Sequence, residues 1–418
     1  TIAGCCAFAL TSPARGGTAF GIYDARTLAM GGASVASANN DNGQFYNAAL
    51  LAFNEEIEER TEDSRFLFPL IIPQVAESAI TIEDLSQDDP IGTMARAVRD
   101  FNAMPDATAA QAVIDIASNL DAALADIDGE DLFADIYFGL GITEPGRFQG
   151  AGFFMGTRLL AGGRPTVTTA DRERLAAYQE GLTFVASDGT EGTAHPELFD
   201  ANGALIDPGS SFDSTVSGAG AFVTEAGVAM SRQLNLFGTE VAAGFSFKVQ
   251  LIDTFEDAER IVDDRIDPQR NSDYDGAVNF DVGLVKAIGE HWRLGLAVKD
   301  IIPHNYDTSL GSVIRLRPRA RLGAAYQAGS LQLAADIDLT RNEPLSTELP
   351  TQELAVGAEW AFSSPVKVRA GFRYDIQGNR DSIASLGVGT QWRRLDFDIA
   401  YAASRDARAA ALQFGIAF

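Results

Sequence analysis

The C-terminal third of the chain alternates apolar and polar positions with a period of two over many consecutive segments. In the last of them, Leu412, Phe414, Ile416 and Phe418 alternate with smaller or polar residues. Side chains two positions apart share one face of a β-strand, so each segment predicts a strand with one apolar and one polar face. The pattern predicts one strand over 315–328 and further strands in succession from residue 330 to residue 418.

The length of the predicted strands and the short connections between them favour a membrane barrel over a soluble sandwich. The predicted strands run for about ten residues, whereas strands in soluble proteins are usually about five or six residues long. Short connections join successive strands, and the last residue is an aromatic on the apolar face. Weaker alternation adds strands near 133–143, 148–160, 218–232, 239–251, 276–288 and 291–300, and a doubtful one over 66–73, where Pro69 interrupts the ladder. The expected fold is all-β: a transmembrane antiparallel β-barrel of about 14 strands over residues 61–418.

Some segments do not fit as wall strands. Residues 91–127 predict a small helical insertion, because apolar residues recur at helical spacing from Val113 to Ile127. Residues 161–217 and 252–275 are polar and rich in turn formers, which predicts long surface loops. Residues 16–52 lack the alternation and carry few charges, yet include large apolar residues that need burial. We therefore expect 16–60 to form an N-terminal plug inside the lumen.

Composition and charge narrow the class of protein. The chain is 46% hydrophobic, but no run of about 18 apolar residues predicts a membrane-spanning helix. A formal net charge of −26 makes nucleic acid an improbable partner, because like charges repel. The expected location is a bacterial outer membrane, with lipid around the barrel.

The N-terminal residues resemble an export signal. Residues 2–10 (IAGCCAFAL) are apolar, and small residues at Ser12 and Ala14 suggest a cleavage site. We expect residues 1–15 to be a signal-peptide remnant. Residues 2–5 (IAGC) also resemble a lipobox, so lipidation at Cys5 is the alternative.

The sequence offers little for catalysis. The three histidines, His195, His291 and His304, stand apart, without the spacing that metal ligands need. There is no GxSxG, Walker or CxxC motif. The sequence therefore predicts no enzyme activity, no cofactor and no metal.

The predicted polar faces carry charges of both signs. Interleaved opposite charges in a narrow lumen can form hydrogen-bonded networks, whereas unpaired ones would be costly. Such a network would either brace the barrel or form a selective ion pore. Its expected members are Arg319, Arg321, Asp336, Asp338, Glu359, Arg369, Arg373, Asp375, Asp396 and Asp398.

Three stretches near the N-terminus carry a family resemblance: residues 20–26 (FGIYDAR), 29–36 (AMGGASVA) and 45–52 (FYNAALLA). They resemble the opening of the TraF-like conjugal-transfer family of outer-membrane proteins. More distantly, they are similar to the FadL long-chain fatty-acid transporter superfamily and the PorV-like secretion barrels. The resemblance implies a plug inside a fourteen-stranded barrel, although Ala48 replaces the proline of the family's Asn-Pro-Ala stretch. The implied plug or gate residues are Phe20, Asp24, Arg26, Met30, Gly31, Gly32, Phe45, Asn47 and Leu50.

Two functions follow from the resemblance. The first is a FadL-like channel for hydrophobic small molecules, gated by the plug. The alternative is a non-transporting structural or accessory barrel of a conjugation or secretion machine; a soluble secreted β-protein is a third reading. Expected partners are outer-membrane lipid, a hydrophobic ligand or an envelope-machine protein, and the barrel-assembly machinery. The last would read an assembly signal at Leu412, Phe414, Ile416 and Phe418.

Overall fold

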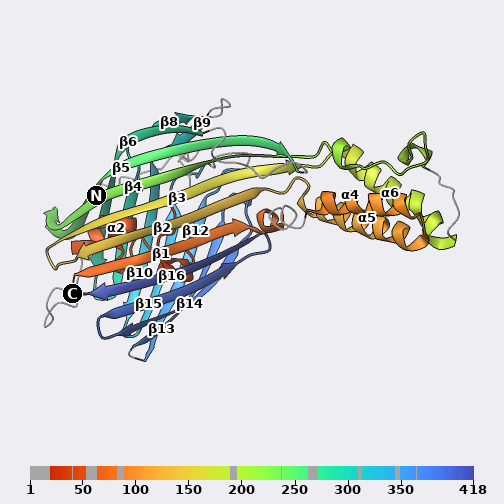
Figure 1. Cartoon of the computed structure of the whole chain (residues 1–418). Helices are drawn as coiled ribbons and strands as arrows, with labels where there is room; N and C mark the ends of the chain where they lie inside the picture. The colour runs from red at the N-terminus through yellow and green to blue at the C-terminus, as the bar shows by residue number, and fades with distance from the viewer. Residues whose placement is uncertain are drawn as a thin grey trace, which may run out of the picture.

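The chain folds into a closed antiparallel barrel of 14 strands (Figure 1). This computed structural model describes residues 19–39, 41–52, 64–81, 89–188, 195–236, 238–261, 272–308, 313–343, 349–363 and 365–418. Sequential neighbours pair around the wall, and β1 closes the ring by pairing with both β2 and β16. The prediction of about 14 antiparallel strands is confirmed. The expected signal segment, residues 1–15 with Cys5, lies outside the described residues.

The wall strands differ greatly in length. The longest, β4 and β5, have 22 residues each, whereas β7 and β11 have eight. One side of the barrel is therefore much taller than the other. The wall consists of β1 (Arg65–Ala76), β2 (Leu132–Glu144), β3 (Gln149–Thr166), β4 (Thr215–Leu236), β5 (Thr239–Arg260), β6 (Ser272–Ile288), β7 (Trp292–Lys299), β10 (Arg319–Ala328), β11 (Leu331–Asp338), β12 (Glu353–Ser363), β13 (Val366–Asp375), β14 (Ile383–Trp392), β15 (Leu395–Ala403) and β16 (Ala407–Ala417).

The doubtful strand around Pro69 is a full wall strand. In β1 the pairing register with both neighbours shifts between Leu67 and Leu70. Pro69 falls within this irregularity, where a residue without a backbone N–H can be accommodated in a sheet.

The outer face of the barrel is apolar. Phe414, Ile416 and Phe418 project outward as predicted, with the half-buried Leu412 on the same face. All three tryptophans, Trp292, Trp360 and Trp392, are exposed close to the short turns at one end. An apolar band bordered by aromatic residues is the surface that a barrel presents to lipid. The closed barrel and this face fit a bacterial outer membrane.

Three helices project beyond the end of the barrel that carries the long connections (Figure 1). Helices α4 (Pro90–Ala103) and α5 (Ala107–Ile127) match the predicted insertion at 91–127, and Asp106 caps α5 by accepting from Ala109 N. Helix α6 (Thr169–Asp188) packs against α5. Among the described helices, none is long and apolar enough to cross a membrane.

The loop predictions at 161–217 and 252–275 were wrong in part. Strand β3 continues to Thr166, and α6 follows because Leu175, Tyr178 and Leu182 are buried against the other helices. At the second segment, β5 continues to Arg260 and β6 begins at Ser272. The end of β5 carries polar residues on both faces, and the end of β3 contains glycines and a proline, which hid the alternation. Short 3-10 turns, η2 (Pro196–Leu198) and η3 (Gly209–Ser211), occupy part of the remaining loop.

The strand predicted over 315–328 divides in two. Only Arg319–Ala328 belongs to the wall, as β10. Residues before it form a separate two-stranded sheet from β8 (His304–Asp307) and β9 (Val313–Leu316).

The described residues between 19 and 52 lie inside the barrel, and we call them the lumenal segment. It contains α1 (Ala25–Ala29), α2 (Gly43–Tyr46) and the 3-10 turn η1 (Ala48–Ala52), which are wholly buried. Helix α1 contacts β13 to β16, whereas η1 contacts β3 to β6 on the opposite side. The segment thus spans the lumen from wall to wall. Of the predicted 16–60, residues 16–18, 40 and 53–60 lie outside the described residues.

Candidate functional site in the barrel lumen

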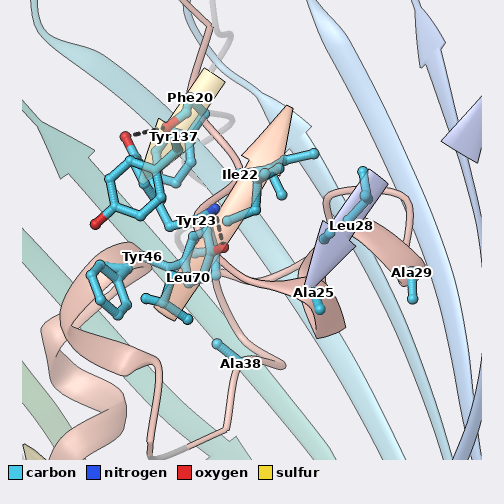
Figure 2. Packing of buried hydrophobic residues seen from close by; sticks show 14 of the residues in the cluster. Phe20, Ile22, Tyr23, Ala25, Leu28, Ala29, Ala38, Tyr46, Leu70 and Tyr137 are labelled. Atoms are coloured by element: carbon cyan, nitrogen blue, oxygen red, sulfur yellow. Dashed lines mark hydrogen bonds between the residues drawn. The ribbon is translucent and has the colours of Figure 1, made fainter. Parts of the chain in front are cut away.

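Aromatic side chains of the lumenal segment and of the wall pack together inside the barrel (Figure 2). The ring of Tyr23 lies 6.0 Å from that of Phe45 and 5.0 Å from that of Tyr137 on β2, edge to face in the second case. The Tyr46 hydroxyl is 2.7 Å from Tyr23 N and accepts its hydrogen bond, and Phe45 lies 5.8 Å from Phe154 on β3. Rings from the lumenal segment and from the wall therefore form one packed core.

Local sequence shapes the first half of the lumenal segment. Asp24 caps α1 by accepting hydrogen bonds from the backbone and the hydroxyl of Thr27, at 2.9 and 2.8 Å. After the helix, Gly31 and Gly32 have φ values of +69° and +97°. This left-handed region favours glycine, and here it lets the chain reverse inside the confined lumen.

Cationic side chains of the wall bind the backbone of the lumenal segment. Arg319 Nη1 donates to the Ala19 carbonyl at 2.7 Å, and Lys299 Nζ donates to the Phe45 carbonyl at 2.9 Å. The ammonium of Lys299 also lies 4.3 Å from the centre of the Tyr23 ring, a cation–π contact. The wall thus provides hydrogen-bond donors to backbone carbonyl groups of the buried segment.

Hydrogen-bond acceptors on the wall bind backbone N–H groups of the lumenal segment. The Asp336 carboxylate accepts from the backbone N–H groups of Ser34 and Val35, at 2.7 and 2.9 Å. Within the segment, the Asn47 amide donates to the Val35 carbonyl at 2.9 Å and also reaches the Leu284 carbonyl of the wall at 3.2 Å. Asn47 therefore ties the two halves of the segment to each other and to β6.

Glycines leave room in the wall at the positions where the lumenal segment lies against it. A Cβ atom added to any of them would overlap backbone or side-chain atoms of the segment. Because these glycines come from seven strands around the barrel, close approach is a property of the whole lumen. They are Gly150, Gly244, Gly283, Gly295, Gly357, Gly371 and Gly387.

The predicted charge network is largely assembled, in two groups. In the first, Glu359 accepts from Arg26 of the lumenal segment at 2.9 Å and from Arg369 at 2.6 Å. Arg369 also pairs with Asp398. In the second, Arg321 pairs with Asp338 at 2.5 Å and with Glu353 at 2.8 Å, and Arg373 lies 3.6 Å from Glu353. Arg26 thus joins the lumenal segment to the first group.

Four predicted members lie apart from these groups. Asp336 accepts from the backbone of the lumenal segment, and Arg319 pairs with Asp300. Asp396 pairs with Arg65 at 3.1 Å. Asp375 lies at the end of β13 and accepts from backbone N–H groups of the nearby loops, including Gln352 at 2.7 Å and Asn379 at 2.8 Å. Its contacts shape a turn at the rim, so placing Asp375 in the lumenal network was wrong.

A third ionic cluster was missed by sequence reasoning. The fully buried Lys248 on β5 lies 2.7 Å from Asp300 and 3.1 Å from both Glu225 and Asp281. Asp300 also pairs with Arg319. Lys248, Glu225 and Asp281 come from separate strands, and Asp300 directly follows β7, so only the pairing register brings these residues together. Among the described residues, no group of three or more His, Cys, Asp or Glu could hold a metal ion.

Small cavities border the lumenal segment. Their volumes are about 30, 10 and 40 Å³. A cavity that binds benzene is larger, about 150 Å³. In this conformation, none of the three holds a molecule of that size.

The barrel is similar to several solved structures. It resembles the Ralstonia pickettii toluene transporter TbuX, with a TM-score of 0.52, 11% identity, and coverage of 95% of this chain and 98% of that one. The Pseudomonas putida toluene transporter TodX matches with a TM-score of 0.46, 12% identity, and coverage of 97% and 99%. A Pseudomonas aeruginosa FadL homologue matches with a TM-score of 0.47 and 13% identity, and the match covers 94% of this chain and 97% of that one. The likeness to TbuX shows a shared fold; the other two are more distant.

Comparison of the sequence with known protein families identifies the family of this chain. No curated protein is significantly similar to the chain. A family model described as "F plasmid transfer operon, TraF, protein" matches residues 44–338, from the lumenal segment to β11. Since this match covers well over half of the chain, the protein belongs to the TraF family.

Proposed function

We propose that this protein is an outer-membrane channel for hydrophobic small molecules, and that the lumenal segment is a plug that closes it. The observation that carries the proposal is the way the segment fills the lumen. It packs an apolar and aromatic core against the wall, and glycines of seven strands make room for its backbone. The shared fold with a protein described as a toluene transporter supports the same function.

The plug's contacts are compatible with movement. Several wall contacts, such as those of Arg319 and Asp336, are hydrogen bonds to the plug's backbone, which water can replace. The plug makes ion pairs to the wall through Arg26, which contacts Glu359, and through Asp41, 3.6 Å from Arg65. When the plug leaves, Glu359 keeps Arg369 as a partner and Arg65 keeps Asp396. Because the cavities are smaller than a benzene site, passage requires the plug to shift.

A disulfide tether tests whether the plug gates the channel. An ideal Cβ on Gly152 lies 3.1 Å from Gln44 Cβ, close to the Cβ separation of about 3.5–4.5 Å in disulfides. We suggest the double variant Gln44→Cys with Gly152→Cys, in a background where Cys5 and Cys6 are serine. The matched controls are the two single-cysteine variants in that background.

The measurement is initial uptake of radiolabelled toluene and oleate by host cells that lack their own channel for hydrophobic compounds. We expect uptake above the empty-vector level for the parent. The oxidised double variant should lose it, and a reductant should restore it. Equal uptake in the oxidised and reduced double variant would refute gating by the plug. Absence of uptake by the parent, with the barrel folded in the membrane, would instead favour a structural barrel of a conjugation or secretion machine.

A further inference from the structure

The connection between β7 and β10 folds back into the barrel. Asp300 directly follows β7 and has a φ of +56°, which turns the chain. The Asn279 side chain on β6 then binds both backbone groups of Ile302, at 2.9 and 3.0 Å. Beyond this anchor, β8 and β9 pair as a hairpin.

The hairpin covers the lumenal face of the tall wall. Arg158 on β3 reaches the plug, and its register partners on β4 and β5 are Val223 and Ile252. Cross-strand partners point to the same side of a sheet, so these two residues face the lumen. Tyr306 and Ile314 of the hairpin are buried in one cluster with Ile252.

The largest of the three cavities, about 40 Å³, lies between hairpin, wall and plug. The hairpin contributes Tyr306, Ile314 and Leu316, the wall contributes Leu160 and Ile252 among others, and the plug contributes Tyr23. Charged side chains of Arg158, Glu225, Asp300 and Arg319 line the other side of this cavity. The cavity therefore has an apolar side above the plug and an ionic side, where Arg319 pairs with Asp300.

We propose that this chamber is a binding subsite for a small hydrocarbon or the apolar part of a ligand, and that the β8–β9 hairpin is its outer door. The inference rests on the proposed channel function. The chamber lies directly against Tyr23, so a ligand held there touches the plug before passage. Its present volume is below the roughly 150 Å³ of a benzene site, so the hairpin must move to admit a ligand.

The hairpin's attachments fit a movable element. Each of its strands has four residues. The Thr254 hydroxyl on β5 donates to the Asp307 carbonyl at 3.2 Å, at the far end of β8. At the base, Arg319 pairs with Asp300 and also binds the Ala19 carbonyl of the plug. The door and the plug therefore share Arg319, and a shift of one changes the contacts of the other.

A charge placed in the chamber tests the subsite. Ile314→Asp puts a carboxylate in the apolar lining, whereas Val313→Asp places the same charge on an exposed neighbour in β9. We expect Ile314→Asp to lower the initial uptake of toluene at least tenfold and Val313→Asp to leave it unchanged. Heat-modifiable mobility of both variants shows that the barrel is folded.

A tether tests the door independently of the lining. Because the Thr254 hydroxyl approaches the Asp307 backbone, Thr254→Cys with Asp307→Cys brings two cysteines near each other. A disulfide between them, verified by mass spectrometry of the oxidised protein, would fix the hairpin to β5. Oxidation should reduce toluene uptake at least tenfold, with recovery on reduction and no effect in the single variants. If the parent transports toluene while Ile314→Asp and the oxidised tether transport it equally well, the subsite is wrong and the channel function stands. If the parent transports none, the channel function itself fails.

Discussion

Gly371 on strand β13 faces Gly31 of the plug with no space between them for a side chain, because a Cβ atom on Gly371 would overlap the Gly31 nitrogen. The obstructing atom belongs to backbone, which cannot rotate away as a flexible side chain would. A methyl group at this wall position must therefore displace the plug or distort the wall.

We expect Gly371→Ala to unseat the plug around Gly31 while leaving the barrel closed. Overpacking of this kind costs about 1–3 kcal/mol. The expected result is faster proteolysis within residues 19–52 and faster reaction of a cysteine placed at Met30. Gly276→Ala is the matched control, since a Cβ on Gly276 meets its nearest neighbour at 3.6 Å, an ordinary contact. Identical proteolysis of the two variants would contradict close packing at Gly371.

Asp336→Ala removes the acceptor for the backbone N–H groups of Ser34 and Val35. A buried donor left without a partner costs about 1–3 kcal/mol, so local opening should become roughly ten- to a hundredfold more frequent. Hydrogen exchange of the peptide containing residues 33–36, followed by mass spectrometry, measures this effect. Asp375→Ala serves as control, because the contacts of Asp375 stabilise a rim turn. Unchanged exchange in Asp336→Ala would show that Asp336 does not hold the plug.

The wall could be predicted from the sequence because one face of each strand meets lipid. That contact imposes a strict alternation, as in Phe414, Ile416 and Phe418, which the structure confirms as outward. Where a segment has no contact with lipid, its sequence lacks this alternation, and the strand was not predicted. The upper part of β5 up to Arg260 has polar residues on both faces, and the short strands of the β8–β9 hairpin have no lipid contact.

The lumen was harder to predict because its contacts depend on register. The ion pairs of Lys248 join strands that no local pattern connects. One signal was overlooked: wall glycines such as Gly357 and Gly371 stand at inward positions, where the plug's backbone lies against them. Helix α6 was also detectable, since Leu175, Tyr178, Leu182 and Val185 recur at helical spacing among charged residues.

Loss of the terminal aromatic should impair assembly. The Phe418 backbone N–H donates to the Ser64 carbonyl at 3.0 Å, and its ring is exposed on the lipid-facing side. Phe418→Asp places a charge there, and charges on the lipid face of a barrel destabilise it, by up to about 1 kcal/mol near an interface. We expect a several-fold lower yield of heat-modifiable barrel in outer membranes, with Phe418→Trp close to wild type. A normal yield of Phe418→Asp would remove residues 412–418 as an assembly signal.

A pH-dependent link lies outside the membrane, in the helical extension. His195 Nδ1 is 2.8 Å from Glu197 and its Nε2 is 3.2 Å from Glu180 on α6. Hydrogen bonds, first to Glu197 and then to Glu180, raise the pKa of His195 above its ordinary value of 6.5. Because the pKa of His195 is higher in the folded than in the unfolded protein, its hydrogen bonds contribute fully to stability at a pH below the unfolded-state pKa. That contribution is lost as the pH rises through the folded-state pKa.

We expect the contact between His195 and Glu180 on α6 to weaken as pH rises through the raised pKa of His195, which lies above 6.5. Titration of histidine-labelled protein in detergent by NMR follows the three histidines, and His195→Gln assigns the signal. Glu197→Gln removes the largest cause of the shift, so it should bring the pKa of His195 back toward 6.5, whereas a change at the distant His291 should not. The bonds also lower the pKa of Glu197, so the link is lost on the acid side as Glu197 becomes protonated. A His195 signal that titrates at or below the ordinary value in the parent would show that these bonds do not form in solution.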